Sequence, residues 1–298
     1  MRELKDILSE KQIRKEEPMR EHTTFRIGGA AKLFLMPDTE EELRELLDYC
    51  RETGLPFFLL GNGSNLLVSD QGFDGAVIQL GEGFQGIVRK GNELTVKAGT
   101  LLARVARQAA KEGLGGLEFA SGIPGSTGGA VFMNAGAYGG EMKQVVSWVK
   151  VMKPEDGTCF LLNKEELSMG YRTSIVKEKG YIVLEVGLKL CERPAEEIQG
   201  TMEELKEARK AKQPLEYPSA GSTFKRPQGY FAGKLIMDAG LRGFQVGGAQ
   251  IAEKHCGFVV NRGEATAQDV MELVEKVQEK VLQEFGVKLE LEVQTLGF

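Results

Sequence analysis

Residues 122–130 read GIPGSTGGA, a run of four glycines, one proline and two hydroxyl side chains without a single charge. An exposed linker is normally more polar, so we expect this segment to pack against a planar, partly apolar ligand. A dinucleotide that carries an aromatic ring system fits this description. A loop that crosses the core without a ligand is the alternative. The expected contact residues are Gly122, Ile123, Pro124, Gly125, Ser126, Gly128 and Gly129.

A second glycine-rich segment, Gly61-Asn62-Gly63-Ser64-Asn65, directly follows the apolar stretch PFFLL at 56–60. Its glycines allow a sharp turn and present bare backbone N–H groups, which suits a diphosphate. Ser64 and the two asparagines add side-chain donors. An ordinary tight turn is the alternative. No GxGxxG follows a strand and no Walker A lysine motif occurs, so a Rossmann or P-loop nucleotide site is unsupported.

The composition bounds the class of protein. A chain of 298 residues exceeds the size at which one hydrophobic core usually stops growing, so we expect two or three subdomains. The net charge of −5 gives no global basic field for nucleic acid, although a local basic cluster is still compatible with small anions. Four scattered cysteines and two histidines argue against a metal site and favour free thiols in a reducing compartment.

The N-terminal region shows no apolar core of a signal peptide, and no apolar run is long enough to cross a bilayer. We therefore expect a cytoplasmic protein. Residues 1–17 are polar and look helical, ending near Pro18.

Alternation of helical and strand-like patterns predicts an α+β architecture. Expected helices cover 40–53, 101–112, 195–212, 231–238 and 267–285, with Thr100 and Thr266 as caps of the second and last. Expected strands cover 31–36, 56–60, 76–80, 94–98, 145–152, 158–162, 181–190, 257–260 and 288–293. A shift in composition at Arg193–Pro194 marks a domain boundary.

Seven motifs, in this order, carry a family resemblance: HTTFRIGG (22–29), LLGNGSNLLVSD (59–70), ASGIPGSTGGAVFMNAGAYGGE (120–141), GYRTS (170–174), SAGSTFKRP (219–227), KHCGFVVN (254–261) and LELEV (289–293). Together they resemble the UDP-N-acetylenolpyruvoylglucosamine reductase (MurB) family of peptidoglycan synthesis. The resemblance covers nearly the whole chain from His22 onward. The compact segment between Ala220 and Asn261 resembles the shorter class of the family, which lacks an extra tyrosine-bearing loop.

The resemblance implies a two-part FAD-binding region of the vanillyl-alcohol-oxidase-like (PCMH) type, followed by a C-terminal α+β substrate-binding domain. We place these parts at 1–85, 86–193 and 194–298, with Glu292 on a last strand that returns to the active site. The implied reaction uses NADPH and bound FAD to reduce the enolpyruvyl ether of UDP-N-acetylglucosamine to UDP-N-acetylmuramate. Hydride goes to C3 and a proton to C2. We expect a monomer that binds neither nucleic acid nor membrane.

Three residues are the candidate catalytic groups. The planar guanidinium of Arg172 suits a carboxylate on which charge builds, although an ordinary surface ion pair is the alternative. The resemblance makes Ser222 the proton donor to C2, where the residues alone indicate a loop cap. It also implies that Glu292 hydrogen-bonds the carboxylate or enol intermediate. In isolation, Glu290 and Glu292 would be the solvated face of a strand.

The expected substrate-binding residues are Tyr171, which packs beside Arg172, and Lys212, Lys225, Arg226 and His255. Arg226 stands where many relatives carry asparagine, so direct uridine-side contacts from that position stay open. A basic set brackets the substrate region and suits a diphosphate: Lys206, Arg209, Lys210, Lys212, Lys225, Arg226 and Lys234. For the first four, which share a helix with glutamates, a solvated face is the alternative. His255 lines the pocket or is structural. Two alternative functions are another FAD-dependent oxidoreductase of this fold and a non-catalytic nucleotide-sugar-binding protein.

Overall fold

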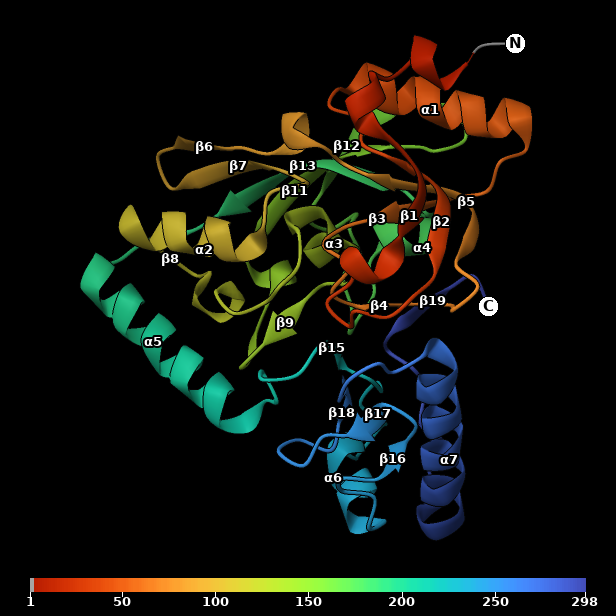
Figure 1. Ribbon diagram of the computed structural model, residues 1–298. Helices are drawn as coiled ribbons and strands as arrows, with labels where there is room; N and C mark the ends of the chain where they lie inside the picture. The colour runs from red at the N-terminus through yellow and green to blue at the C-terminus, as the bar shows by residue number, and fades with distance from the viewer. Residues whose placement is uncertain (1–2) are drawn as a thin grey trace. The chain divides into compact units, whose positions relative to one another are not determined.

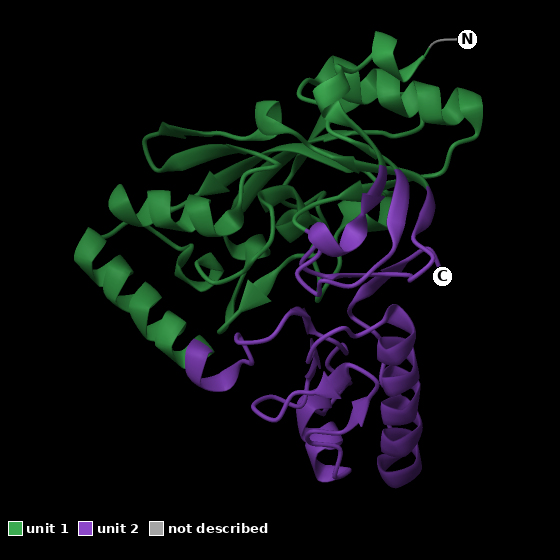
Figure 2. Ribbon diagram, in the orientation of Figure 1, with its two compact units in different colours: residues 1–15, 33–62, 75–209 green, residues 16–32, 63–74, 210–298 purple. Residues whose placement is uncertain are grey.

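The computed structural model describes residues 3–298, drawn in Figure 1. Contacts within the chain divide it into two compact units, each described by itself (Figure 2). Unit 1 contains residues up to 15, 33–62 and 75–209; unit 2 contains 16–32, 63–74 and 210–298. Both units are assembled from separated stretches of chain. The three-part division with boundaries at 85 and 193 stays a prediction.

Unit 1 is built on a five-stranded antiparallel sheet. Its strand order is β12 (Cys159–Asn163), β11 (Val146–Met152), β13 (Ile182–Lys189), β7 (Glu93–Lys97) and β6 (Ile87–Lys90). Helix α2 (Leu102–Lys111) contributes Leu102, Val105, Ala106 and Ala109 to the core. The strands predicted here are confirmed to within a residue or two. The predicted cap is wrong: Leu101 takes the N-cap position, because the Thr100 hydroxyl is bonded to the backbone of Gly86.

A four-stranded sheet has the order β1 (Ile13–Pro18), β2 (Ala30–Leu35), β5 (Phe73–Gln79), β3 (Phe57–Leu60), in which β3 and β5 are parallel. Helix α1 (Glu40–Thr53) follows β2, with a capping box at its start and left-handed Gly54 at its end. The prediction of a helical N-terminus is wrong. From residue 3 onward, where the structure describes the chain, two short 3-10 helices precede β1: η1 (Leu4–Asp6) and η2 (Glu10–Gln12). Charged, exposed residues suit β1 because it is an edge strand.

Unit 2 contains a second four-stranded sheet in the order β15 (Ser219–Ser222), β18 (Phe258–Asn261), β17 (Ala249–Ile251), β16 (Gln245–Val246). Helix α6 (Ala232–Asp238) and helix α7 (Ala267–Phe285) pack with it around a common apolar core. Thr266 caps α7 as predicted. The carboxylate of Asp70 also accepts the N–H groups of Ala267 and Gln268, at 2.8 and 3.0 Å.

The prediction of a last strand at 288–293 is wrong in its bounds. The strand that the structure forms is β19 (Gln294–Leu296), parallel to β4 (Leu66–Val68). Residues 290–292 instead make a two-bond pairing with 223–225, around an isolated bridge between Phe224 and Leu291. That pairing is too short to count as a β-strand. Glu292 therefore lies just before β19 and not on it.

The remaining elements are short except for α5 (Ala195–Lys212), which has the predicted bounds. They are η3 (Met19–Glu21), η4 (Glu82–Phe84), β8 (Leu114–Gly115), η5 (Glu118–Ala120), α3 (Thr127–Phe132), β9 (Gly136–Ala137), β10 (Gly140–Glu141), η6 (Met142–Gln144), α4 (Ile175–Lys179) and β14 (Cys191–Glu192). Within 3–298, none of the helices combines the length and apolar character that a membrane crossing requires.

Candidate active site

The two glycine-rich segments meet inside unit 1. The Asn62 side-chain amide donates to the carbonyl oxygen of Pro124 over 2.6 Å. A β-carbon added at Gly61 would lie 2.8 Å from the Ser126 hydroxyl oxygen, so a larger residue there would require that hydroxyl to move. The hydroxyl of Ser126 caps α3 by accepting the N–H of Gly129 at 3.2 Å. Residues far apart in sequence thus form one continuous backbone surface.

Part of this surface is open and part of it is fixed within the unit. Gly61, Asn62, Gly122, Pro124 and Gly129 are exposed, although their neighbours 126–128 are buried. The buried part is fixed: Gly128 donates to the carbonyl of Ala98 at 2.9 Å, and a β-carbon there would come within 3.0 Å of the Ala98 side chain. Rigid, side-chain-free backbone open on one side is the arrangement expected for close contact with a dinucleotide.

The rest of the first loop belongs to unit 2. Gly63 is buried with φ +61°, and a β-carbon there would overlap the carbonyl oxygen of His22. Its own carbonyl accepts the N–H of Thr24 at 3.1 Å. Asn65, predicted as a diphosphate donor, directs its side-chain amide to the carbonyl of Glu292 at 3.1 Å. Ser64 is half-buried.

Arg172 lies in a tight turn of unit 1 and has φ +57°, a left-handed conformation that costs a non-glycine residue about 1–2 kcal/mol. The turn is closed by Gly170 and Thr173, which bond to each other. The Arg172 guanidinium stands 5.1 Å from the centre of the Tyr171 ring, so Tyr171 packs beside it as expected. Backbone strain of this kind clusters at functional sites, which is compatible with the predicted role.

Sequence patterns did not reveal the residue that holds this turn. Asn134 is buried and has φ +44°. The side-chain Nδ2 of Asn134 donates to the carbonyl of Gly170 at 2.9 Å and to the Glu141 carboxylate at 2.8 Å. Its side-chain Oδ1 accepts the N–H of Lys143 at 2.9 Å. Its place in the AVFMNAGAYGG motif was the available signal, since asparagine tolerates the left-handed region better than most residues.

Ser222 and Glu292 lie on neighbouring segments of unit 2. The Glu292 N–H donates to the carbonyl of Thr223, the residue after Ser222, at 2.9 Å. The Lys225 N–H donates to the carbonyl of Glu290 at 2.8 Å. Both Ser222 and Glu292 are half-buried. Unit 2 therefore brings together two of the three predicted catalytic residues, and the third, Arg172, belongs to unit 1.

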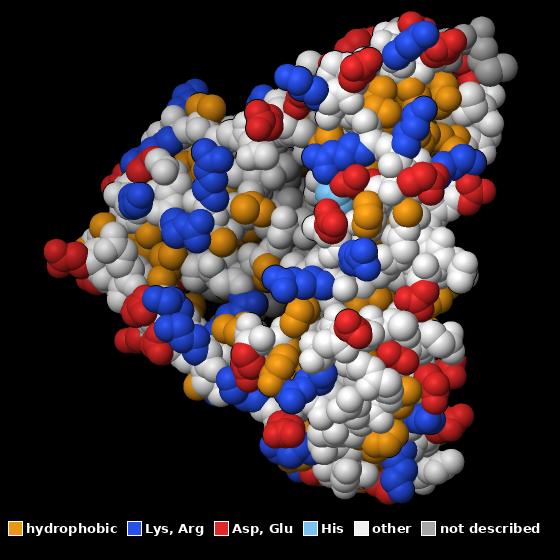
Figure 3. All heavy atoms as spheres, in the orientation of Figure 1, with side chains coloured by type: hydrophobic (Ala, Val, Ile, Leu, Met, Phe, Trp, Pro, Cys, Tyr) orange, Lys and Arg blue, Asp and Glu red, His pale blue; other side chains and the backbone are white. Residues whose placement is uncertain are grey.

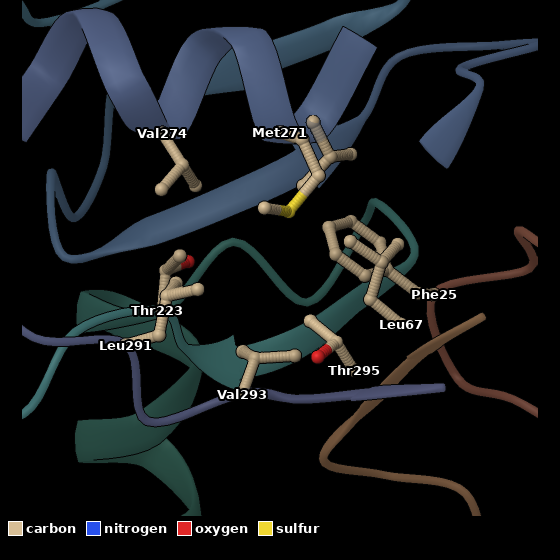
Figure 4. Close-up of a pocket in the computed structure, with 9 residues that line it drawn as sticks. Phe25, Leu67, Thr223, Met271, Val274, Leu291, Val293 and Thr295 are labelled. Atoms are coloured by element: carbon tan, nitrogen blue, oxygen red, sulfur yellow. The ribbon is translucent and has the colours of Figure 1, made fainter. Parts of the chain in front are cut away.

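A small apolar cavity lies behind this pair of segments, under α7 (Figure 4). Its lining is Phe25, Leu67, Thr223, Val270, Met271, Val274, Leu291, Val293 and Thr295. Leu291 and Val293, the residues on either side of Glu292, both face the cavity. Without charged groups, this cavity belongs to the core of the unit and does not suit an anionic substrate.

The predicted substrate-binding residues of unit 2 have partners of their own. Lys225 forms an exposed ion pair with Glu290, with 3.1 Å between Nζ and Oε2. Arg226 lies 4.6 Å from the centre of the Phe231 ring, whose side chain is 61% exposed. Lys212 is exposed at the end of α5. These contacts lie at the surface, where ion pairs are weak and exchangeable.

His255 is half-buried, with its ring edge-to-face with Phe258 at a centroid distance of 5.0 Å. Its Nδ1 accepts the Gly257 N–H at 3.1 Å, which requires that nitrogen to be unprotonated. Burial lowers the pKa of the imidazole below its usual value. At neutral pH the ring is therefore neutral and carries its proton on Nε2.

The basic residues on α5 and α6 differ among themselves. Lys206 pairs with Glu203 at 2.7 Å and Lys234 with Asp238 at 2.8 Å, as in a solvated face. Arg209 instead lies against the glycine-rich loop, and a β-carbon at Gly122 would be 2.6 Å from its Nη1. On the face shown in Figure 3, basic and acidic side chains are interspersed, in keeping with the net charge of −5.

Thiol chemistry has no support in the site. Burial raises the pKa of the Cys50 thiol to about 11 and also raises that of Cys256. A protonated thiol is a poor nucleophile and a poor metal ligand. Within residues 3–298, no group of three or more His, Cys, Asp and Glu side chains is placed to hold a metal ion.

Comparison with known proteins identifies relatives over almost the whole chain. A family model described as "UDP-N-acetylenolpyruvoylglucosamine reductase, C-terminal domain" matches residues 213–296, and one described as "FAD binding domain" matches 31–163. The chain is 54% identical to the UDP-N-acetylenolpyruvoylglucosamine reductase of Agathobacter rectalis, covering 95% of this chain and 93% of the relative. It is 50% identical to that of Lachnoclostridium phytofermentans, covering 100% and 97%.

A solved structure also resembles the whole chain. The crystal structure of UDP-N-acetylenolpyruvylglucosamine reductase (MurB) from Thermus caldophilus is 44% identical and superimposes with a TM-score of 0.81. The match covers 95% of this chain and 98% of that chain. The expected fold class, an α+β chain with a PCMH-type FAD-binding region and a C-terminal domain, is confirmed.

Proposed function

The chain belongs to the UDP-N-acetylenolpyruvoylglucosamine reductase family of FAD-dependent oxidoreductases, and we propose that Arg172, Ser222 and Glu292 supply the chemistry that its cofactor does not. The reaction reduces the enolpyruvyl ether of UDP-N-acetylglucosamine to the lactyl ether of UDP-N-acetylmuramate, with NADPH as the electron donor. When bound, FAD would supply the hydride transfer from NADPH to C3 of the enolpyruvyl group. The protein must then stabilise negative charge at C2 and its carboxylate, and protonate C2.

The backbone of Gly61, Asn62 and Gly122–Gly129 holds the FAD diphosphate in this proposal. Support comes from the exposed glycine surface that the Asn62–Pro124 bond creates. No lysine motif is needed, because backbone N–H groups and glycines can contact a diphosphate directly.

Arg172 binds the substrate carboxylate. Its guanidinium stays charged at physiological pH and can donate two parallel hydrogen bonds, which strengthen as charge moves onto the carboxylate. The left-handed turn and the Tyr171 ring restrict where the guanidinium can go before substrate binds. Such preorganisation lowers the cost of stabilising charge in the transition state.

Ser222 donates the proton. Its O–H bond breaks as the new C–H bond forms at C2, and the alkoxide left behind takes a proton from solvent. Glu292 hydrogen-bonds the carboxylate or enol and holds it in the orientation that protonation requires. The observation that supports this assignment is the backbone pairing of 223–225 with 290–292, which sets Ser222 and Glu292 on neighbouring segments.

Lys212, Lys225 and Arg226 attract the diphosphate of the substrate, His255 lines the substrate pocket, and Tyr171 is positioned beside Arg172. They occupy exposed or half-buried positions, and the Lys225–Glu290 pair is loose enough to open for an anion. His255 would donate from Nε2, since its Nδ1 is already an acceptor.

The enzyme acts as a cytoplasmic monomer in this proposal. All four cysteines carry free thiols, as is usual in a reducing compartment. A lone protomer contains every residue that the proposed chemistry uses. Analytical ultracentrifugation tests the oligomeric state, and a stable dimer at micromolar concentration would contradict it.

An anaerobic two-step titration tests the function. We expect the purified protein to be yellow, NADPH to bleach it, and the enolpyruvyl sugar nucleotide to restore the colour. Bleaching without restoration would instead favour an oxidoreductase with another substrate. A protein that stays colourless after addition of FAD would point to a non-catalytic nucleotide-sugar-binding protein.

A further inference from the structure

Asn65 makes two hydrogen bonds to the segment that contains Glu292. Its side-chain Nδ2 donates to the carbonyl oxygen of Glu292 at 3.1 Å, and its own carbonyl accepts the N–H of Gln294 at 3.1 Å. Parallel pairing of β4 with β19 begins at the next residue, with Gln294 opposite Leu66. The last residue of the glycine-rich loop therefore holds the C-terminal segment through both its side chain and its backbone.

The Glu292 residue is consequently fixed on two sides. Its N–H donates to the carbonyl of Thr223, and its C=O accepts from Asn65. Leu291 and Val293, the residues on either side, anchor the segment by facing the apolar cavity (Figure 4). The orientation of the Glu292 Cα–Cβ bond is thereby set by the backbone bonds and by the two apolar neighbours.

The side-chain amide of Asn65 is already used as a donor within the protein. The same holds for Asn62, but the two amides have different targets: Asn62 bonds the other glycine-rich loop, whereas Asn65 bonds the catalytic segment. The bond to Glu292 uses one of the two N–H donors of Nδ2 and directs the amide group toward the backbone of that residue, while Oδ1 can only accept.

We propose that Asn65 is a positioning residue that acts through Glu292 and does not hold FAD. This inference rests on the role proposed above for Glu292. It differs from the expectation that every polar residue of the loop donates to the diphosphate. Loss of the Asn65 amide would free the Glu292 peptide on one side and misplace its carboxylate, and misplacement of a catalytic group by about 1 Å can cost two orders of magnitude in rate.

The test separates the two half-reactions of the holoenzyme by anaerobic stopped-flow spectroscopy. For Asn65→Ala we expect unchanged FAD affinity and an unchanged rate of bleaching by NADPH. Recovery of colour with the enolpyruvyl sugar nucleotide should slow by about tenfold or more. Asn65→Asp, which keeps the shape but replaces the donor by an acceptor, should show the same split. It carries the test if the alanine variant does not fold.

A matched control is available in the same segment. Gln278, on α7, donates its side-chain amide to the carbonyl of Leu289 at 2.9 Å, three residues before Glu292. Gln278→Ala removes the same kind of bond from the same segment and should leave both half-reactions unchanged. If this variant slows the sugar half-reaction as much as Asn65→Ala does, the effect is general loosening and the inference fails.

Comparison with Glu292→Gln decides whether Asn65 works through Glu292. The double variant should be no slower than Glu292→Gln alone, because the amide has no further role once the carboxylate is gone. Multiplicative losses, or weakened FAD binding in Asn65→Ala, would overturn the inference. If Glu292→Gln itself leaves the sugar half-reaction intact, the proposed role of Glu292 fails. Slowing in Glu292→Gln without slowing in Asn65→Ala refutes only the role of Asn65.

Discussion

The side-chain amide of Asn62 lies 2.6 Å from the carbonyl oxygen of Pro124, and within unit 1 this bond joins the start of the first glycine-rich loop to the second. Sixty-two residues separate the partners along the chain. The side-chain N–H of Asn62 donates in this bond and the backbone carbonyl of Pro124 accepts. The geometry of the proposed FAD surface thus depends on the bond between the Asn62 side chain and the Pro124 backbone.

Replacing Asn62 should therefore weaken FAD binding. Loss of one hydrogen bond of about 1–1.5 kcal/mol predicts an increase of roughly tenfold in the Kd of Asn62→Ala for FAD. Flavin fluorescence during titration of the apoprotein measures this directly. Gln108→Ala, which removes an exposed amide on α2, is the control and should not change the Kd. Equal affinities of Asn62→Ala and the parent protein would contradict the prediction.

Ser222→Ala should separate the two half-reactions. NADPH should bleach the flavin at the normal rate, because no proton transfer from Ser222 is needed there. Turnover of the sugar should fall by about 10²–10⁴-fold, the usual contribution of a general acid. Ser219→Ala, on the same strand β15, controls for local disturbance. Comparable loss in both half-reactions would mean that Ser222 has a structural role.

Gly63 and Gly54 form a matched pair that tests whether the close contact of the first glycine-rich loop with His22 matters for stability. Both have positive φ, +61° and +68°, but a β-carbon at Gly63 would overlap the His22 carbonyl, whereas the space at Gly54 is open. Gly54→Ala should cost about 1–2 kcal/mol in the free energy of unfolding, from backbone strain alone. Gly63→Ala should cost clearly more and reduce bound FAD. Equal losses in denaturant unfolding would show that the contact with His22 does not constrain the loop.

His255 should make the protein less stable in mild acid. Burial lowers the pKa of the folded-state imidazole, so below about pH 6.5 the unfolded chain binds more protons than the folded one. The free energy of unfolding should then fall as pH decreases, by less than about 1.4 kcal/mol per pH unit, the limit for one proton. His255→Gln should reduce this slope near pH 6. The measurement is urea unfolding at several pH values between 5.5 and 7.5. If the free energy of unfolding depends on pH equally in the parent protein and in His255→Gln, another group causes the acid sensitivity.

Local patterns were sufficient for the longer helices, but they did not predict the short helices α3 and α4 or the contacts between distant segments. The bounds of α1, α5 and α7 were predictable because caps, glycines and prolines act within a few residues. The position of β19 was not, since its partner β4 lies more than two hundred residues earlier in the chain. The sequence likewise identified Asn62 and Asn65 as hydrogen-bond donors. Only the folded chain shows that their targets are Pro124 and Glu292.

Arg172 permits a test in which the side chain and the backbone conformation are separated. Arg172→Ala and Arg172→Gly both remove the guanidinium, and both should nearly abolish reduction of the sugar while NADPH still bleaches the flavin. They should differ in stability, because φ is +57° and glycine avoids the left-handed penalty. We expect the glycine variant to be more stable than the alanine variant by about 1 kcal/mol.

Arg172→Lys supplies the third arm of this test. Lysine keeps the charge and loses the planar two-pronged donor, so its activity should lie between those of the parent and of Arg172→Ala. Glu264, exposed with φ +53°, is the control for the backbone effect: Glu264→Gly should be more stable than Glu264→Ala by a similar amount and keep full activity. If Arg172→Lys matched the parent protein in the sugar half-reaction, simple charge would be sufficient and the two-pronged grip on the carboxylate would be refuted.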